Sequence, residues 1–285
     1  MINNYKGVED TAAFSAVVNK LRKFCLAKGF TEVHTQDRLS ILAACEDPDT
    51  VATYDYMGQK WPLPQTGQMW LEYELLKNPK LPGVFTVNTS FRNEPNPVPG
   101  RHKLIFPMFE FELPGSIEDL QAFETEMLEY LGFGKRSDFH YKSYDWLKKF
   151  YKVRELTNKH ENAMEADFGP VVFCGNFPSY TSPFWNMKKN GKTHAHKIDV
   201  IIHGAETIGS AERSTDPLEM KEGFYKISDG KYAKKLFELF GKDRVEKELQ
   251  EFLGMDFFPR VGGAFGVTRL LDAAKKHGLL EPAAA

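Results

Sequence analysis

The stretch Ser90–Leu113, SFRNEPNPVPGRHKLIFPMFEFEL, places charged residues on two apolar, strand-like segments around a proline-rich turn. Alternate residues of a strand share a face, so Arg92 points with Glu94, and Glu110 points with Glu112. One interpretation is a ladder of salt bridges on a solvated sheet face, which would contribute little stability. The other interpretation is that these charges bind a ligand.

Residues in and just after the turn favour a nucleotide as that ligand. Arg101 and His102 lie in the turn, and Phe106 begins the second segment. Guanidinium groups bind phosphate oxygens, and an aromatic ring can stack on a base. The hairpin therefore combines chemistry for the phosphates and the base of one nucleotide.

A second charged cluster lies in KIDVIIHGAETIGSAERSTD, residues 197–216. Here Asp199 and Glu206 are followed by small residues and then by Arg213. Two carboxylates near an arginine suit Mg²⁺–ATP, because Mg²⁺ prefers hard oxygen ligands. An exposed acid–base cluster on paired strands is the alternative interpretation.

The glycine-rich segment VGGAFGVTRLL, residues 261–271, predicts a turn that runs into a helix headed by Arg269. Glycines allow a ligand or a facing strand to approach the backbone. Their spacing is neither GxGxxG nor GxxxxGK[ST]. Close packing of a helix on a strand is the alternative explanation.

Hydrophobic periodicity predicts the elements that position these residues. Helices are expected at 11–28, 69–76, 116–131, 231–253 and after the glycine-rich turn, and strands at 30–35, 83–94, 105–113, 197–204 and 206–216. Strands paired by hairpins and separate helices indicate an α+β fold, an antiparallel sheet flanked by helices. Without an internal repeat or a low-complexity linker, residues 1–285 are expected to form one domain.

Composition narrows the classes of function. The chain has 285 residues and a formal net charge of −2, which gives no overall attraction to nucleic acid. It has no apolar run of membrane-spanning length and no signal-peptide core, so we expect a cytoplasmic protein without a membrane partner. Its three separated cysteines predict buried free thiols. The His194 and His196 pair is expected in a solvated loop, because the sequence indicates no third metal ligand.

Taken together and in order, these segments resemble the three signature motifs of class II aminoacyl-tRNA synthetases, most closely the aspartyl and asparaginyl enzymes. TGQMWLE (residues 66–72) is similar to their SGQLxxE, and FRNE…RHKLIFPMFEFE to their FRxE…RHxxEFxxxExE. NFPSYTSPFW resembles their YP…PFY segment, and IDVIIHGAETIGSAER their DLxxxGxEIxGGxxR. The resemblance covers nearly the whole chain and implies a catalytic domain without an anticodon-binding domain.

Carried over by position, the resemblance implies a complete adenylating site. Arg92 would hold the α-phosphate of ATP, Arg101 and Arg269 the outer phosphates, and Phe106 the adenine. Arg92 and Arg269 would be the catalytic residues. The remaining implied residues are Glu94, His102, Glu206 and Gly266 for ATP, Asp199 and Glu206 for Mg²⁺, and Gln68, Glu72, Glu74 and Arg213 for the amino acid.

The chain also departs from the family pattern. Gln36 replaces a proline of the first motif, and Ile105 replaces a glutamate that contacts adenine. Leu71 stands where aspartyl enzymes carry a lysine for the side-chain carboxylate. Thr268 replaces an acidic residue, so GGAFGVTRL is closer to the GGGIGQSRL style of the ammonia-dependent asparagine synthetase A.

The resemblance therefore implies an AMP-forming ligase that makes asparagine from aspartate, ammonia and ATP, with Mg²⁺ as cofactor. One alternative is a compact asparaginyl- or aspartyl-tRNA ligase core, and another is a silent paralogue that binds ATP or an amino acid. A homodimer is expected, because the first motif forms a two-fold interface in this class.

Overall fold

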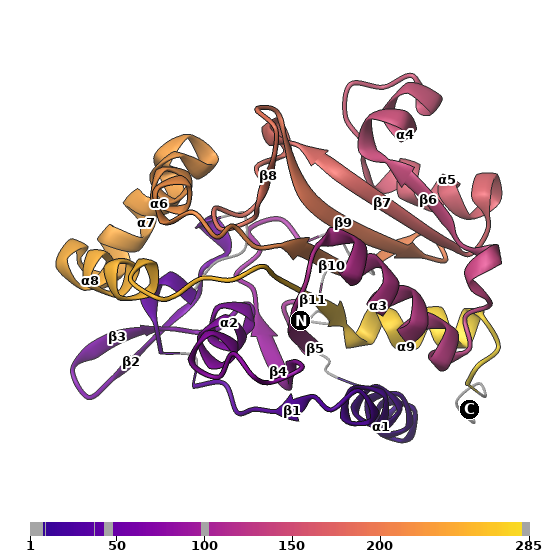
Figure 1. Cartoon of the computed structure of the whole chain (residues 1–285), viewed down its shortest axis with the longest axis horizontal. Coiled ribbons are helices and arrows are strands. Elements are labelled where there is room, and N and C mark those ends of the chain that lie inside the picture. The colour runs from indigo at the N-terminus through magenta and orange to yellow at the C-terminus, as the bar shows by residue number, and fades with distance from the viewer. Residues whose placement is uncertain (1–7, 9, 37, 43–47, 98–102, 281–285) are drawn as a thin grey trace.

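The computed structural model describes residues 8, 10–36, 38–42, 48–97 and 103–280, and its centre is a twisted, mostly antiparallel sheet (Figure 1). Among the described residues, nine strands form this sheet in the order β1-β4-β5-β11-β10-β9-β7-β6, with β8 paired to β9. Their bounds are β1 (Thr31–Glu32), β4 (Val84–Phe91), β5 (Ile105–Pro114), β6 (His140–Ser143), β7 (Val171–Pro178), β8 (Lys189–Asn190), β9 (His194–Ile202), β10 (Ala205–Glu212) and β11 (Arg260–Gly266). A separate hairpin pairs β2 (Thr53–Tyr56) with β3 (Gln59–Pro62).

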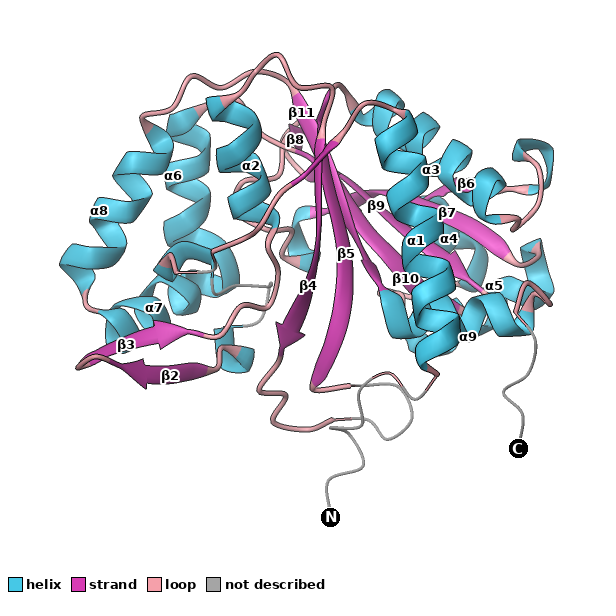
Figure 2. Cartoon of the chain, turned by 90° about the horizontal axis from the view of Figure 1, so that it is seen from below, coloured by secondary structure: helices cyan, strands magenta, loops and turns pink. Residues whose placement is uncertain are grey.

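Helices cover both faces of the sheet (Figure 2). One face packs against α1 (Thr11–Ala27), α3 (Ile117–Leu131) and α9 (Val267–Lys276). The other face carries α2 (Gln68–Lys77), which packs with α6 (Pro217–Lys226), α7 (Lys231–Phe240) and α8 (Lys242–Leu253). At the far end of the sheet, α4 (Tyr144–Tyr151) and α5 (Asn158–Phe168) pack against β7. Short 3-10 turns span Ser40–Leu42, Pro48–Thr50, Arg136–Asp138, Ser179–Thr181 and Ile227–Gly230.

Local sequence signals explain where the helices begin. The Asp10 side chain caps α1 by accepting a hydrogen bond from the Ala13 N–H at 2.9 Å. Ser116 and Asp119 form a reciprocal capping box at the start of α3. Asp216 caps α6 directly before Pro217, a residue suited to the first helical position.

Alternation along β5 decides which residues face the core and which face the site. Phe109 and Phe111 are fully buried in the core beneath α1, α3 and α9. Glu110 and Glu112 point to the opposite face and are also fully buried. The interpretation of these acids as a solvated salt-bridge ladder is therefore wrong.

The α+β fold class, an antiparallel sheet flanked by helices, is confirmed, with four local corrections. The predicted strand 30–35 is only two residues long, and the predicted glycine-rich turn is strand β11. The predicted helix 231–253 is two helices, because Gly241 adopts a φ of 84° between α7 and α8. The two histidines expected in a loop lie in β9, where His194 contacts Asp145 and His196 contacts Glu212.

Two further observations bear on the predictions from composition. Cys25 and Cys174 are free and buried, as predicted, and Cys45 lies outside the described residues. Among the described helices, none combines the length and the apolar character needed to cross a bilayer.

Candidate functional site

A cavity of about 630 Å³ opens on the face of the sheet that carries α2. Its walls come from the segment that joins β4 to β5, from β5, β9, β10 and β11, from the starts of α7 and α9 and from the N-terminal part of α2. The predicted site residues that line it are Gln68, Glu72, Arg92, Glu94, Phe106, Glu206, Arg213, Gly266 and Arg269. Segments distant in sequence therefore meet around one space large enough for a nucleotide and a small ligand.

Arg92 and Phe106 form one wall of the cavity at the end of the β4–β5 hairpin where the two strands are connected. The Arg92 guanidinium carbon lies 5.4 Å from the centre of the Phe106 ring. The backbone N–H of Arg92 donates to the Leu104 carbonyl at 2.8 Å. The Arg92 Nε is buried and donates a hydrogen bond to no described residue. Buried donors are nearly always paired, so this group fits an anionic ligand oxygen.

Arg269 reaches the cavity from the first turn of α9. Its Nη1 donates to the Glu206 carbonyl at 2.7 Å and lies 3.7 Å from Glu206 Oε2. About a third of this side chain is exposed, so it can also contact a ligand. Gly266, at the end of β11, leaves the space beside Arg269 open, since an added Cβ would come no closer than 3.9 Å to its Cδ.

Asp199 and Glu206 approach each other over a glycine of β10. A Cβ added at Gly209 would lie 3.3 Å from Glu206 Oε1 and 3.7 Å from Asp199 Oδ1. Glu206 lines the cavity, whereas Asp199 is not among the lining residues and pairs at 3.3 Å with Lys197, which does line it. Across the parts of the chain that the structure describes, no three potential ligands cluster as a metal site. Two hard carboxylates fit Mg²⁺ when phosphate oxygens complete its coordination.

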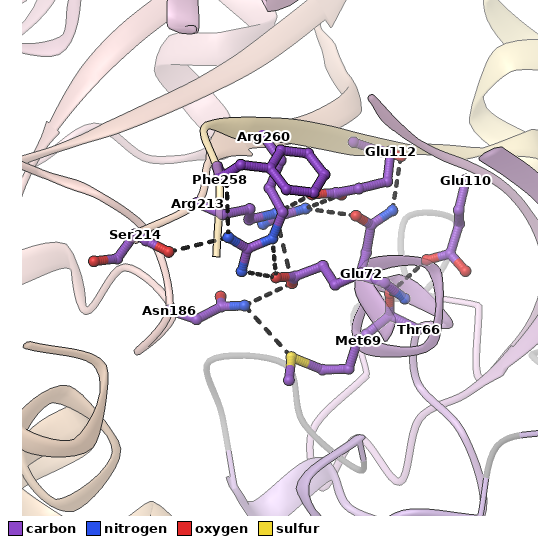
Figure 3. Close-up of polar contacts among 12 residues, drawn as sticks. Thr66, Met69, Glu72, Glu110, Glu112, Asn186, Arg213, Ser214, Phe258 and Arg260 are labelled. Carbon is purple, nitrogen blue, oxygen red and sulfur yellow. Dashed lines mark hydrogen bonds and ion pairs between the residues drawn. The ribbon is translucent and has the colours of Figure 1, made fainter. Parts of the chain in front are cut away.

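The end of the cavity nearest α2 is built on four buried charged residues, Glu72, Glu112, Arg213 and Arg260, the buried ion cluster (Figure 3). Arg213 donates through Nε and Nη2 to the two oxygens of Glu112, both at 3.2 Å. Arg260 donates through Nε to Glu72 Oε2 at 3.0 Å, and its Nη2 donates to the same oxygen. Buried charges need such partners, because an unpaired one is costly to desolvate.

Neighbouring polar groups hold this cluster in place. Asn186 donates through Nδ2 to Glu72 Oε1 at 2.6 Å, and Gln68 accepts a hydrogen bond from Arg213. Glu110 accepts the Gly67 N–H at 2.6 Å and the Thr66 hydroxyl, which anchors the N-terminal turn of α2 (Figure 3). The position of Gln68 and Glu72 therefore depends on an acid of β5.

A glycine of β11 makes room for the cluster. Gly262 lies opposite Glu112 in the β5–β11 ladder, and an added Cβ would lie 1.6 Å from Glu112 Oε2. The carboxylate thus occupies the space above a residue without a side chain. The next glycine, Gly263, leaves room for the Ser210 side chain on the opposite face of the sheet. A Cβ added at Gly263 would lie 2.6 Å from the Ser210 Cβ. Strand packing is therefore a sufficient reason for this glycine pair.

Some predicted site residues lie elsewhere. Glu74 is half-buried on α2 and does not line the cavity. Glu72 lines the cavity, but its carboxylate is already paired with Arg260 and Asn186. Arg101 and His102 lie outside the described residues.

Sequence reasoning also missed residues that line or support the cavity. Three lysines that the sequence analysis did not single out line the cavity: Lys103, Lys197 and Lys231. Asn186 directly follows the NFPSYTSPFW segment, so that match indicated its neighbourhood without singling it out. Arg260 gave no signal, because an isolated arginine before a strand is indistinguishable from a surface residue.

Comparison with known proteins places these features in a family. The family model described as tRNA synthetases class II (D, K and N) matches residues 6–276. A lysine–tRNA ligase of Campylobacter jejuni subsp. doylei is 23% identical over 320 aligned residues, which cover 95% of this chain and 62% of the relative.

Solved structures show the same fold. The asparaginyl-tRNA synthetase of Pyrococcus horikoshii, complexed with asparaginyl-adenylate, superposes with a TM-score of 0.76 at 20% identity, covering 93% of this chain and 65% of that one. The Entamoeba histolytica asparaginyl-tRNA synthetase, also with asparaginyl-adenylate, gives a TM-score of 0.72 at 19% identity, with coverages of 91% and 62%. The chain thus spans less than two thirds of the length of these proteins. It belongs to the class II tRNA synthetase family (D, K and N).

Proposed function

We propose that this chain is an AMP-forming ligase that makes asparagine from aspartate, ammonia and ATP. In the first step, an oxygen of the aspartate side-chain carboxylate attacks the α-phosphorus of ATP, and pyrophosphate leaves. In the second step, ammonia attacks the acyl carbon of the aspartyl-adenylate, AMP leaves with the bonding electrons, and nitrogen loses a proton. Neither step needs a nucleophile from the protein.

The observation that carries the adenylation step is the buried Arg92 Nε beside the Phe106 ring, a donor that has no hydrogen-bond partner in the described part of the chain. A phosphate oxygen would accept from this buried donor while the base stacks on the ring. Arg269 on the facing element, together with Arg101, would contact the outer phosphates. Fixed positive charge around the reacting phosphorus stabilises the charge that develops in the transition state.

The rest of the site supports the substrates. Asp199 and Glu206 would hold Mg²⁺, which would neutralise phosphate charge, and Glu94 and Gly266 would border the nucleotide. Aspartate would lie with its α-carboxylate toward Arg213 and its side-chain carboxylate toward ATP. Its α-ammonium would lie near Gln68 and Glu72, although Arg260 already neutralises much of the Glu72 charge.

A second candidate is a ligase core that transfers asparagine to tRNA. Leu71 replaces the lysine of aspartyl enzymes in the sequence pattern, but it packs with Leu75 and Val84 and does not line the cavity, so it does not discriminate between the two candidates. The asparaginyl-tRNA synthetases of similar fold make this candidate a close competitor.

Product analysis separates these functions. The protein is incubated with ATP, Mg²⁺, labelled aspartate and ammonium, with and without total tRNA. AMP, pyrophosphate and free labelled asparagine without RNA support the first proposal. Pyrophosphate exchange driven by asparagine alone, with RNA as the acceptor, supports the second, and release of ADP and phosphate contradicts both.

A further inference from the structure

The amino-acid end of the cavity already contains a counter-ion for the arginine that is expected to bind the ligand. Arg213 is 5% exposed, and two of its nitrogens donate to Glu112, which is completely buried. Nη2 also donates to Gln68, whereas Nη1 donates to no described residue. A ligand can therefore reach one edge of this guanidinium, but its charge is already balanced.

The surrounding charges leave no surplus of positive charge for a second anion. Five buried charged side chains meet at this end of the cavity. The carboxylates are Glu72 of α2 and Glu110 and Glu112 of β5, and the guanidinium groups are Arg260 of β11 and Arg213, which follows β10. Arg260 is committed to Glu72 and to the Ser214 carbonyl at 3.1 Å. Three buried carboxylates thus face two guanidinium groups, so a ligand carboxylate would add uncompensated negative charge in a desolvated site.

Protonation of one carboxylate removes this conflict at the smallest structural cost. Arg213, the partner of Glu112, is the group that a ligand carboxylate would bind, so Glu112 is the acid left without a counter-ion. Its carboxylate fills the space above Gly262. Glu72 remains paired with Arg260, and Glu110 remains bonded to the start of α2.

We propose that Glu112 is a specificity-determining residue coupled to a proton. A ligand carboxylate replaces Glu112 as the partner of Arg213, and Glu112 takes up one proton from solvent as the ligand binds. An uncharged carboxamide binds at Arg213 without this uptake. This inference rests on the proposed function only in taking aspartate or asparagine as the ligand.

The electrostatics of the free protein are consistent with this coupling. Burial raises the pKa of Glu112 to about 7, against the lowering effect of Arg213. Once Arg213 pairs with a ligand, that lowering effect weakens and the pKa of Glu112 rises further. Proton uptake on binding is therefore expected above pH 7, where the free protein has lost this proton and the complex retains it.

Aspartate gives a test that does not depend on its orientation, since either end presents a carboxylate to Arg213. Calorimetric titrations at pH 8 in two buffers of different ionisation enthalpy measure the protons taken up. We expect close to one proton per aspartate, and an affinity for aspartate that falls about tenfold per pH unit above pH 7. Asparagine bound through its carboxamide should take up none.

Two variants with the same chemical change identify the group that takes up the proton. Glu112→Gln should abolish the uptake and flatten the pH dependence of aspartate affinity. Glu124→Gln is the matched control. Glu124 is also a completely buried glutamate, but it lies on α3 and does not line the cavity. That variant should keep the wild-type proton count.

Each outcome decides the inference. Aspartate binding without net proton uptake by the wild-type protein overturns it, and this measurement does not require a variant to fold. Uptake that persists in Glu112→Gln also overturns it. If aspartate binds with one Glu112-dependent proton but no adenylate forms, the inference stands and the proposed function fails. If neither amino acid binds at any pH, both fail.

Discussion

The buried carboxyl group of Glu124 should lower the free energy of unfolding as the pH rises, and a single substitution should remove this effect. The Glu124 side chain lies on α3 beneath the sheet and is fully buried, and the neighbouring Ser210 hydroxyl offsets only part of the cost of that burial. Burial raises the pKa of this carboxyl group from an ordinary value of 4.5 to about 8. The folded protein therefore keeps a proton at pH 7 that the unfolded chain has lost.

The sign and size of the effect follow from this difference in bound protons. Because the folded state binds more protons, wild-type stability falls as pH rises from 4.5 to about 8, by roughly 1.4 kcal/mol per pH unit. Below pH 4.5 both states are protonated, and above pH 8 both are ionised, so the slope vanishes. At pH 7 the accumulated loss is about 3 kcal/mol.

Glu124→Gln replaces the protonated carboxyl with a neutral group of the same shape and removes this dependence. The variant should match the wild-type stability near pH 4 and exceed it by about 3 kcal/mol at pH 7. Guanidinium unfolding between pH 4 and pH 8.5 measures both curves. Glu126→Gln, on the same helix but about half-exposed and paired with Lys28, is the control and should not remove the loss of stability between pH 4.5 and pH 8.

A constant difference between Glu124→Gln and wild type across this pH range would refute the reasoning, since it would show that Glu124 does not titrate differently in the two states. The same conclusion would follow if the variant were no more stable than wild type at pH 8.

The remaining predictions concern the site, the glycines and assembly. Gly262→Ala should destabilise the protein by about 3–5 kcal/mol in guanidinium unfolding, since its Cβ displaces Glu112 from Arg213, whereas Gly266→Ala in the same strand should cost less than about 1 kcal/mol. Arg92→Ala and Arg269→Ala should each reduce pyrophosphate exchange by the equivalent of about 2–4 kcal/mol of transition-state stabilisation, and exposed Arg136→Ala should leave it unchanged. Light scattering should give a dimer mass, because α1 and the short edge strand β1 lie where the class II pattern has its first motif, which is expected to form a two-fold interface. A monomer mass would contradict this.

Much of the fold could be predicted because its elements have local signals. The helical spacing of apolar residues predicted α1 and α3 closely, and strand alternation predicted the β4–β5 and β9–β10 hairpins. The errors arose where tertiary packing decides. Lysines and glutamates continue a helical pattern through Gly241, but the backbone there adopts a left-handed φ that ends one helix and begins another.

The site was predicted in part for a related physical reason. Alternation places Glu110 and Glu112 on one face, but it does not say whether water or an arginine meets them. The partner of Glu112 lies 101 residues further along the chain, and the partner of Glu72 lies 188 residues further along. Pairing over such separations is set by the sheet order, which no local pattern contains.

Once the strand register is known, the glycines of β11 indicate where the side chains of β5 have room to be buried. In the pairing of β5 with β11, Gly262 lies opposite Glu112 and Gly263 lies opposite Phe111. A residue with a side chain at 262 would exclude the buried carboxylate, and one at 263 would collide with the Ser210 side chain on the other face. Glu112 and Gly262 are thus complementary, since the buried carboxylate occupies the space that a side chain at position 262 would fill. Arg213 can keep Glu112 as its counter-ion because Gly262 is a glycine, so the charge balance at the amino-acid end of the cavity depends on a residue without a side chain.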